Sequence, residues 1–185
     1  MSKLWLIEGL PGSGKTTFAE TLAATQAYTF YSEIDVSHPV DVHDVYWVEA
    51  GGVTEGEVID QDGNGRFIRY RLNEHRLGVD VYELPFDIHV ELMVGRWRRF
   101  VERVKGEHGT YVFECAFLQN PFTIGMVAQD VPNKQIEAYI ETVANLLTPL
   151  DPTVVYLETA DSVATWFRRV LHHSRLRSGK RVERD

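Results

Sequence analysis

The strongest constraint on this chain lies near its N-terminus, where residues 9–16 read Gly-Leu-Pro-Gly-Ser-Gly-Lys-Thr. This run satisfies the pattern G-x-x-x-x-G-K-[ST], which forms a loop between a strand and a helix. The flanking residues agree, because apolar residues 4–7 precede the loop and Phe18 and Leu22 lie four apart after it. Glycines let successive backbone N–H groups point inward at a helix N-terminus, so the loop is predicted to bind an anion.

The completeness of this motif predicts binding of a nucleoside triphosphate together with Mg²⁺. Lys15 is expected to contact the β- and γ-phosphates, and the Thr16 hydroxyl is expected to ligate the metal. The predicted nucleotide-binding residues are Gly9, Leu10, Pro11, Gly12, Ser13, Gly14, Lys15, Thr16 and Thr17. A glycine-rich turn without a ligand is the alternative, and the flanking strand and helix disfavour it.

Length, charge and cysteine content narrow the class of protein. The 185 residues suit one domain spanning 1–185, and 44% of them are hydrophobic, as in soluble globular proteins. The net charge of −8 argues against a general binder of nucleic acid or anionic membranes, which needs a basic surface. No apolar run approaches the roughly 20 residues of a membrane-spanning helix. With a single cysteine, Cys115, and a start that resembles a strand rather than a signal peptide, the chain is expected to be cytoplasmic.

Alternating strands and helices predict an α/β fold, a three-layer sandwich around a parallel sheet. Strands are expected at 4–7, 28–34, 111–113 and 153–157, and helices after residue 14, at 86–105, at 134–148 and from Ser162 toward His173. Residues 45–80 are interpreted as an insertion, in which 57–60 and 66–69 form a hairpin, and a loop is expected through Asn120 and Pro121. In the helix at 86–105, Arg96, Arg98 and Arg99 lie mostly off the apolar stripe.

A phosphoryl-transfer site also needs carboxylates beside the phosphate loop. Glu114 follows an apolar strand and is expected at the ligand-binding edge of the sheet, close to Mg²⁺. Glu33 and Asp35 stand two apart at the end of the second strand, where either one orients an acceptor hydroxyl, with Glu33 slightly preferred. The alternatives are a structural ion pair for Glu114 and solvated turn residues for Glu33 and Asp35.

The C-terminal segment 168–185 is basic, with seven Lys or Arg against two acidic residues. Its candidates for a lid that closes over the phosphates are Arg168, Arg169, Arg175 and Arg177. A solvated helical face is the alternative for each arginine. The histidines have no metal-site spacing, so Mg²⁺ carried by the nucleotide is the one metal expected. Cys115 is expected to be a small buried hydrophobe.

With these residues, the chain resembles the P-loop kinases that act on nucleosides, nucleotides and small molecules. The segments GLPGSGKTTFAE, YELPFDIHVELMVGRW and YVFECAFLQNPFTIGM also resemble an uncharacterised bacterial P-loop family. The kinase resemblance implies a parallel sheet in the order 2-3-1-4-5, an acceptor pocket near Glu33 and Asp35, and an arginine-bearing lid. Deoxynucleoside kinases continue past the Val-Phe-Glu of residues 112–114 with arginine and serine, whereas Cys115 and Ala116 follow here. No fifth strand is evident after residue 157.

These features predict an ATP- and Mg²⁺-dependent kinase that phosphorylates a small acceptor, either a nucleoside, a nucleotide or another hydroxyl compound. Lys15 and Thr16 hold the donor, Glu114 positions Mg²⁺ through water, and Arg168 and Arg169 stabilise the transition state. A nucleotide-gated ATPase or switch that acts through a protein partner is the alternative, with Gln119 positioning water. A nucleotide-binding protein without catalysis is a third hypothesis. No Asn/Thr-Lys-x-Asp element follows the last strand, which disfavours guanine specificity.

Overall fold

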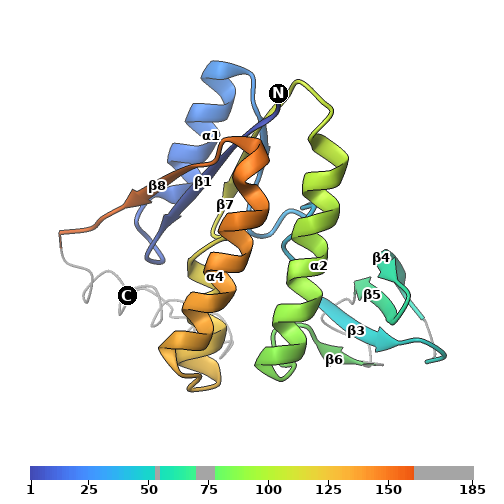
Figure 1. The fold of residues 1–185 in the computed structure, drawn as a ribbon. Helices are drawn as coiled ribbons and strands as arrows, with labels where there is room; N and C mark the ends of the chain where they lie inside the picture. Colours follow the sequence, from blue (N-terminus) through green and yellow to red (C-terminus); the bar gives the residue numbers. More distant parts are fainter. Residues whose placement is uncertain (53–54, 70–77, 161–185) are drawn as a thin grey trace, which may run out of the picture.

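The chain folds around a four-stranded parallel sheet in the computed structural model, which describes residues 1–52, 55–69 and 78–160. The strands are β1 (Lys3–Gly9), β2 (Thr29–Tyr31), β7 (Thr110–Glu114) and β8 (Thr153–Leu157). They lie in the order β2-β7-β1-β8, and each neighbouring pair is parallel (Figure 1). Counted along the chain, this order is 2-3-1-4, so the expected topology is confirmed for four strands. The described ranges contain no fifth strand of this sheet.

Helices cover both faces of the parallel sheet (Figure 1). On one face lies α1 (Lys15–Gln26), and on the other lie α2 (Phe86–Val104) and α4 (Asn133–Leu147). Because side chains alternate along a strand, Leu6 and Phe113 enter the core beneath α2 and α4, whereas their neighbours Ile7 and Val112 pack against α1. The predicted three-layer α/β sandwich is therefore present.

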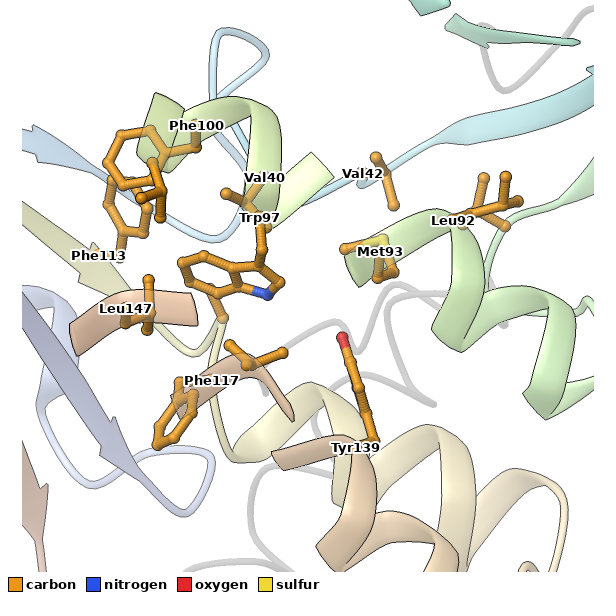
Figure 2. Packing of buried hydrophobic residues seen from close by; sticks show 14 of the residues in the cluster. Val40, Val42, Leu92, Met93, Trp97, Phe100, Phe113, Phe117, Tyr139 and Leu147 are labelled. Atoms are coloured by element: carbon orange, nitrogen blue, oxygen red, sulfur yellow. The ribbon is translucent and has the colours of Figure 1, made fainter. Parts of the chain in front are cut away.

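The core between the sheet and α2 is built around Trp97, which is fully buried. Figure 2 shows the indole among Phe113 of β7, Phe117 beyond that strand and Leu147 of α4. The Trp97 and Phe113 rings have centroids 5.9 Å apart. The predicted helix at 86–105 is confirmed, because Pro85 precedes its first residue and its apolar stripe faces this core.

The segment from 45 to 80 forms a second, antiparallel sheet in the order β4-β5-β3-β6. Its strands are β3 (Val45–Glu49), β4 (Glu57–Asp62), β5 (Gly65–Arg69) and β6 (Val79–Asp80). The predicted hairpin is β4 and β5, joined by the two residues Gly63 and Asn64. The sequence analysis predicted neither β3 nor its pairing with β5 and β6, and β6 is only two residues long.

Two local elements differ from the expectation. The second strand is shorter than the expected 28–34, since β2 ends at Tyr31 and the chain turns at residues 33–34. The loop expected through Pro121 is helical instead, as α3 (Gln119–Phe122) and a π-helix, η1 (Thr123–Ala128). Pro121 fits there because the first turn of a helix needs no N–H from it. A short 3₁₀ turn, η2 (Thr148–Leu150), follows α4.

The helix expected from Ser162 lies outside the described residues. So do the basic-segment candidates Arg168, Arg169, Arg175 and Arg177. Within the part of the chain that the structure describes, no helix is both long and apolar enough to cross a membrane.

Arg96 corrects the expectation that the arginines of α2 lie off its buried face, because only 4% of it is exposed. Its Nε donates to the carbonyl of Val40 at 2.7 Å, and its Nη2 donates to the carbonyl of Pro39 at 3.1 Å. Its Nη1 lies 2.6 Å from Oδ2 of Asp60 in β4. The guanidinium thus links α2 to the segment after β2 and to the second sheet, whereas Arg98 is exposed as expected.

Replacement of Arg96 is expected to be costly. Arg96→Ala removes one of the two arginine partners of Asp60 and leaves the carbonyls of Val40 and Pro39 without this donor, so the free energy of unfolding should fall by about 3 kcal/mol. Arg98→Ala, an exposed change in the same helix, should alter it by less than about 0.5 kcal/mol. Urea denaturation of both variants measures the difference, and equal losses would show that Arg96 does not stabilise the fold in this way.

Candidate functional site

The loop between β1 and α1 has the backbone that its glycines require. Gly9, Gly12 and Gly14 all have positive φ, at 146°, 87° and 88°. A Cβ at Gly9 would lie 2.6 Å from the carbonyl oxygen of Leu157, at the end of the neighbouring strand β8. Glycine at position 9 is therefore needed both for its backbone conformation and for the close approach of β8.

The N-terminus of α1 faces this loop. Gly14 is its N-cap, and no side chain caps the first turn. Lys15 is 5% exposed, and its Nζ donates to the carbonyl of Leu10 at 2.9 Å, so the lysine folds back over the loop. The hydroxyl oxygen of Ser13 is buried without a hydrogen-bond partner. Uncapped N–H groups and a lysine at one helix N-terminus form an environment that suits a phosphate.

A carboxylate meets the loop from the neighbouring strand. Thr16 donates its hydroxyl hydrogen to Oε1 of Glu114, with 2.6 Å between the oxygens. The two meet because β1 and β7 are parallel, with Ile7 opposite Glu114, so both strands end at the same edge of the sheet. Burial raises the pKa of Glu114. The hydrogen bond from Thr16 and the charge of Lys15 act in the opposite direction but are smaller effects.

Glu33 and Cys115 complete a small cluster with Glu114. One ligand atom from each of the three residues lies within 4.8 Å of the other two. Cys115 is fully buried, as expected, and burial raises the pKa of its thiol, so the sulfur is a protonated, poor metal ligand. Carboxylate and hydroxyl oxygens are the ligands that Mg²⁺ prefers, so Thr16 and Glu114 fit this ion better than the cysteine does.

Glu33 and Asp35 do not share one face, contrary to the expectation for an extended strand, because the chain turns directly after β2. Asp35 accepts hydrogen bonds from the backbone N–H and the hydroxyl of Ser37, at 2.8 and 2.7 Å. These two bonds lower the pKa of Asp35. Of the two candidates, the structure brings Glu33 to Glu114 and engages Asp35 in a local turn.

Glu8 is a buried carboxylate that the sequence analysis missed. It is fully buried, and its two oxygens accept the backbone N–H groups of Phe117 at 2.9 Å and Gln119 at 3.0 Å. Burial raises the pKa of Glu8, while these backbone bonds lower it. The sequence did indicate that Glu8 is buried, because side chains alternate along β1 and Glu8 therefore lies on the core-facing side with Leu6. Glu8 therefore fixes the chain that follows Glu114.

Asp41 is a second buried carboxylate that sequence reasoning missed. Its Oδ1 accepts hydrogen bonds from the Tyr82 hydroxyl and, at 2.8 Å, from the N–H of Val42. Its Oδ2 accepts from the side-chain amide of Asn120 in α3 at 3.1 Å. The carboxylate thus joins the segment after β2, the segment before α2 and the helix beyond β7. No sequence motif marks it, because its partners come from distant parts of the chain.

Comparison with known proteins finds solved structures that are only distantly similar to this chain. No protein-family model matches the chain, and no curated protein does. A solved structure of deoxyadenosine kinase from M. mycoides with bound dATP is similar over 91% of this chain and 71% of that one, with 14% identity and a TM-score of 0.44. A gluconokinase from Sinorhizobium meliloti 1021 is similar over 94% of this chain and 93% of that one, with 11% identity and a TM-score of 0.28.

The chain has the fold of a P-loop NTPase. Because both likenesses are distant, this assignment rests on the molecule itself: a parallel sheet in the order 2-3-1-4, and a G-x-x-x-x-G-K-T loop that joins the third strand in that order to the following helix.

Neutralising Glu8 should destabilise the loop beyond β7. In Glu8→Gln, one oxygen that accepts a backbone N–H becomes an amide NH₂, which opposes that donor, so we expect a loss of about 2 kcal/mol in unfolding free energy. Glu137→Gln, an exposed change in α4, is the matched control and should be neutral. Thermal or urea unfolding tests this, and a Glu8→Gln variant as stable as the control would contradict it.

His38 makes stability depend on pH. It is 4% exposed, and its Nδ1 accepts the N–H groups of Val40 at 3.1 Å and Asp41 at 2.7 Å, which leaves the ring proton on Nε2. Its ring packs against Phe113, with 4.5 Å between centroids. Burial lowers the pKa of His38 from 6.5 to about 4, with Arg96 also lowering it and Asp41 opposing.

Below pH 6.5 the unfolded chain therefore binds a proton at His38, whereas the folded chain binds it only near pH 4. The free energy of unfolding therefore falls as the pH decreases from 6.5 to about 4. The unfolding free energy should drop by about 2 kcal/mol between pH 7 and pH 5 from this group. His38→Asn retains an acceptor near the Nδ1 position without the titration, so its drop should be smaller by that amount. His43→Asn, at an exposed position, should retain the full drop, and denaturation at both pH values decides between them.

Proposed function

We propose that this protein is an ATP- and Mg²⁺-dependent kinase that transfers the γ-phosphoryl group to a hydroxyl of a small molecule. The observation that carries the proposal is the hydrogen bond of 2.6 Å between Thr16 and Glu114, beside Lys15. A loop alone accounts for phosphate binding. A hydroxyl and a carboxylate joined at the edge of the sheet add the oxygen ligands that a nucleotide-bound Mg²⁺ requires.

Each residue of the proposed site has a separate role. The loop residues 9–17 bind the phosphates through their backbone N–H groups, and Lys15 pairs with the β- and γ-phosphates. Thr16 and Glu114 would hold Mg²⁺, which when bound neutralises charge on the transferring phosphoryl group. The position of Glu33, with a carboxylate oxygen within 4.8 Å of one of Glu114, supports Glu33 as the group that orients the acceptor hydroxyl. Arg168 and Arg169 remain lid candidates from sequence alone.

Kinetics with a set of acceptors test the proposal. Purified protein is incubated with γ-labelled ATP, Mg²⁺ and nucleosides, nucleotides, sugars or aminoglycosides, and both labelled product and ADP are measured. One acceptor class should yield product, and Lys15→Met and Glu114→Gln should each lower its rate by about 100-fold or more, because both stabilise developing charge. Arg98→Gln, on the exposed side of α2, should have the wild-type rate.

Two outcomes separate the alternatives. ADP formation that needs no acceptor would favour a nucleotide-gated ATPase, for which the structure offers Gln119: its side-chain oxygen accepts from the Cys115 thiol at 3.5 Å, next to Glu114. ATP binding without ADP or labelled product from any acceptor would contradict the kinase proposal and leave a nucleotide-binding protein.

A further inference from the structure

A cavity of about 550 Å³ lies between the C-terminal half of α2, strand β4 and the segment 36–39 after β2. Its volume is in the range of small-molecule sites. None of its lining residues belongs to the phosphate loop 9–17 or to the cluster of Glu33, Glu114 and Cys115. The cavity is therefore a feature separate from the proposed nucleotide site.

Positive charge dominates the cavity wall, although the protein as a whole is acidic, with a net charge of −8. Four arginines line it, Arg69, Arg96, Arg99 and Arg103, against two carboxylates, Glu57 and Asp60. A single oxygen of Asp60 lies 2.6 Å from both Arg96 and Arg99, so one carboxylate serves two guanidinium groups. Arg99 also reaches Asp62 at 3.9 Å, and Arg69 pairs with Glu57 at 2.6 Å.

Among the residues that the structure describes, Arg103 finds no carboxylate partner, unlike the other three arginines of this wall. It is exposed, its guanidinium lies 5.8 Å from the centre of the Phe100 ring, and no acidic group of the described residues pairs with it. Arg99 precedes it by one helical turn and is partly exposed, at 38% of its side chain. These two side chains can therefore turn toward a ligand without breaking the Arg96 contacts that stabilise the fold.

Unpartnered donors give an independent indication of a missing acceptor. Six buried side-chain polar atoms in the described ranges lack a hydrogen-bond partner, and three of them belong to residues of this cavity: Nε2 of His38, Nε of Arg69 and Nε of Arg99. All three are N–H donors, because Nδ1 of His38 already accepts two backbone N–H groups. Buried donors without acceptors are rare in folded proteins, and an anionic ligand supplies acceptor oxygens.

From the cavity, its excess of arginine and these donors, we infer that the pocket binds a phosphate or carboxylate group of a small molecule. Arginine recognises both groups through the same paired N–H donors, so the two anions share one chemistry. The inference does not depend on phosphoryl transfer. One residue connects the pocket to the candidate site: His38 lines the pocket, and its ring packs against Phe113, the residue before Glu114.

Isothermal titration calorimetry tests this inference with the full chain at constant ionic strength. The titrants are inorganic phosphate, citrate and, as an uncharged control, glycerol. All titrations use the Lys15→Met background, which removes the charge of the phosphate loop and leaves its backbone N–H groups equal in every variant compared. Phosphate or citrate should bind with a Kd of about 1 mM or lower, and glycerol should not bind. Phosphate without citrate identifies a phosphate ligand, and the reverse identifies a carboxylate.

Matched variants locate the binding. The double variant Arg99→Gln with Arg103→Gln should raise the Kd for the anion about tenfold or more, because two charged side chains that donate hydrogen bonds are lost. Arg98→Gln, at the residue immediately before Arg99 but absent from the wall, should leave the Kd unchanged. Circular dichroism checks that each variant is folded. No heat with either anion, or an affinity that the double variant retains, would overturn the inference, whatever the outcome of the kinase assay.

Discussion

Parallel pairing of β1 with β7 is the constraint on which the candidate site depends. With Ile7 opposite Glu114, the two strands end together, and the loop after one meets the carboxylate at the end of the other. The same pairing puts Glu8 beside the chain that leaves β7, where its oxygens accept two backbone N–H groups. One carboxylate thus faces the loop, while the other holds the backbone that follows Glu114.

Buried polar contacts extend this organisation to the second sheet. Arg96 binds carbonyls of the segment after β2 and a carboxylate of β4, and Asp41 joins Tyr82 to Asn120. Such groups are costly to bury unless they are paired, so these contacts are sensitive to each partner and fix relative positions. The cavity wall shares Arg96 with this network, and another of its lining residues, His38, packs against the ring of Phe113.

Sequence patterns predicted what depends on local periodicity and on the complete loop motif: four parallel strands, the helices expected at 86–105 and 134–148, and the β4–β5 hairpin. The order of the strands was implied by the resemblance to P-loop kinases. They did not predict features that depend on contacts between distant segments. Arg96 falls off the apolar stripe yet is buried, because carbonyls and Asp60 arrive from elsewhere. Glu33 and Asp35 were read as strand neighbours, but β2 ends at Tyr31 and the turn separates them.

The central claim is that Thr16 and Glu114 act together on nucleotide-bound Mg²⁺, and a double-mutant cycle tests it most directly. ATP affinity is measured with and without Mg²⁺ for wild type, Thr16→Val, Glu114→Gln and the double variant. The account predicts that each single change weakens binding only when Mg²⁺ is present, and that the double change weakens it by at least about 1 kcal/mol less than the sum. Additive losses, or equal losses without Mg²⁺, would contradict it.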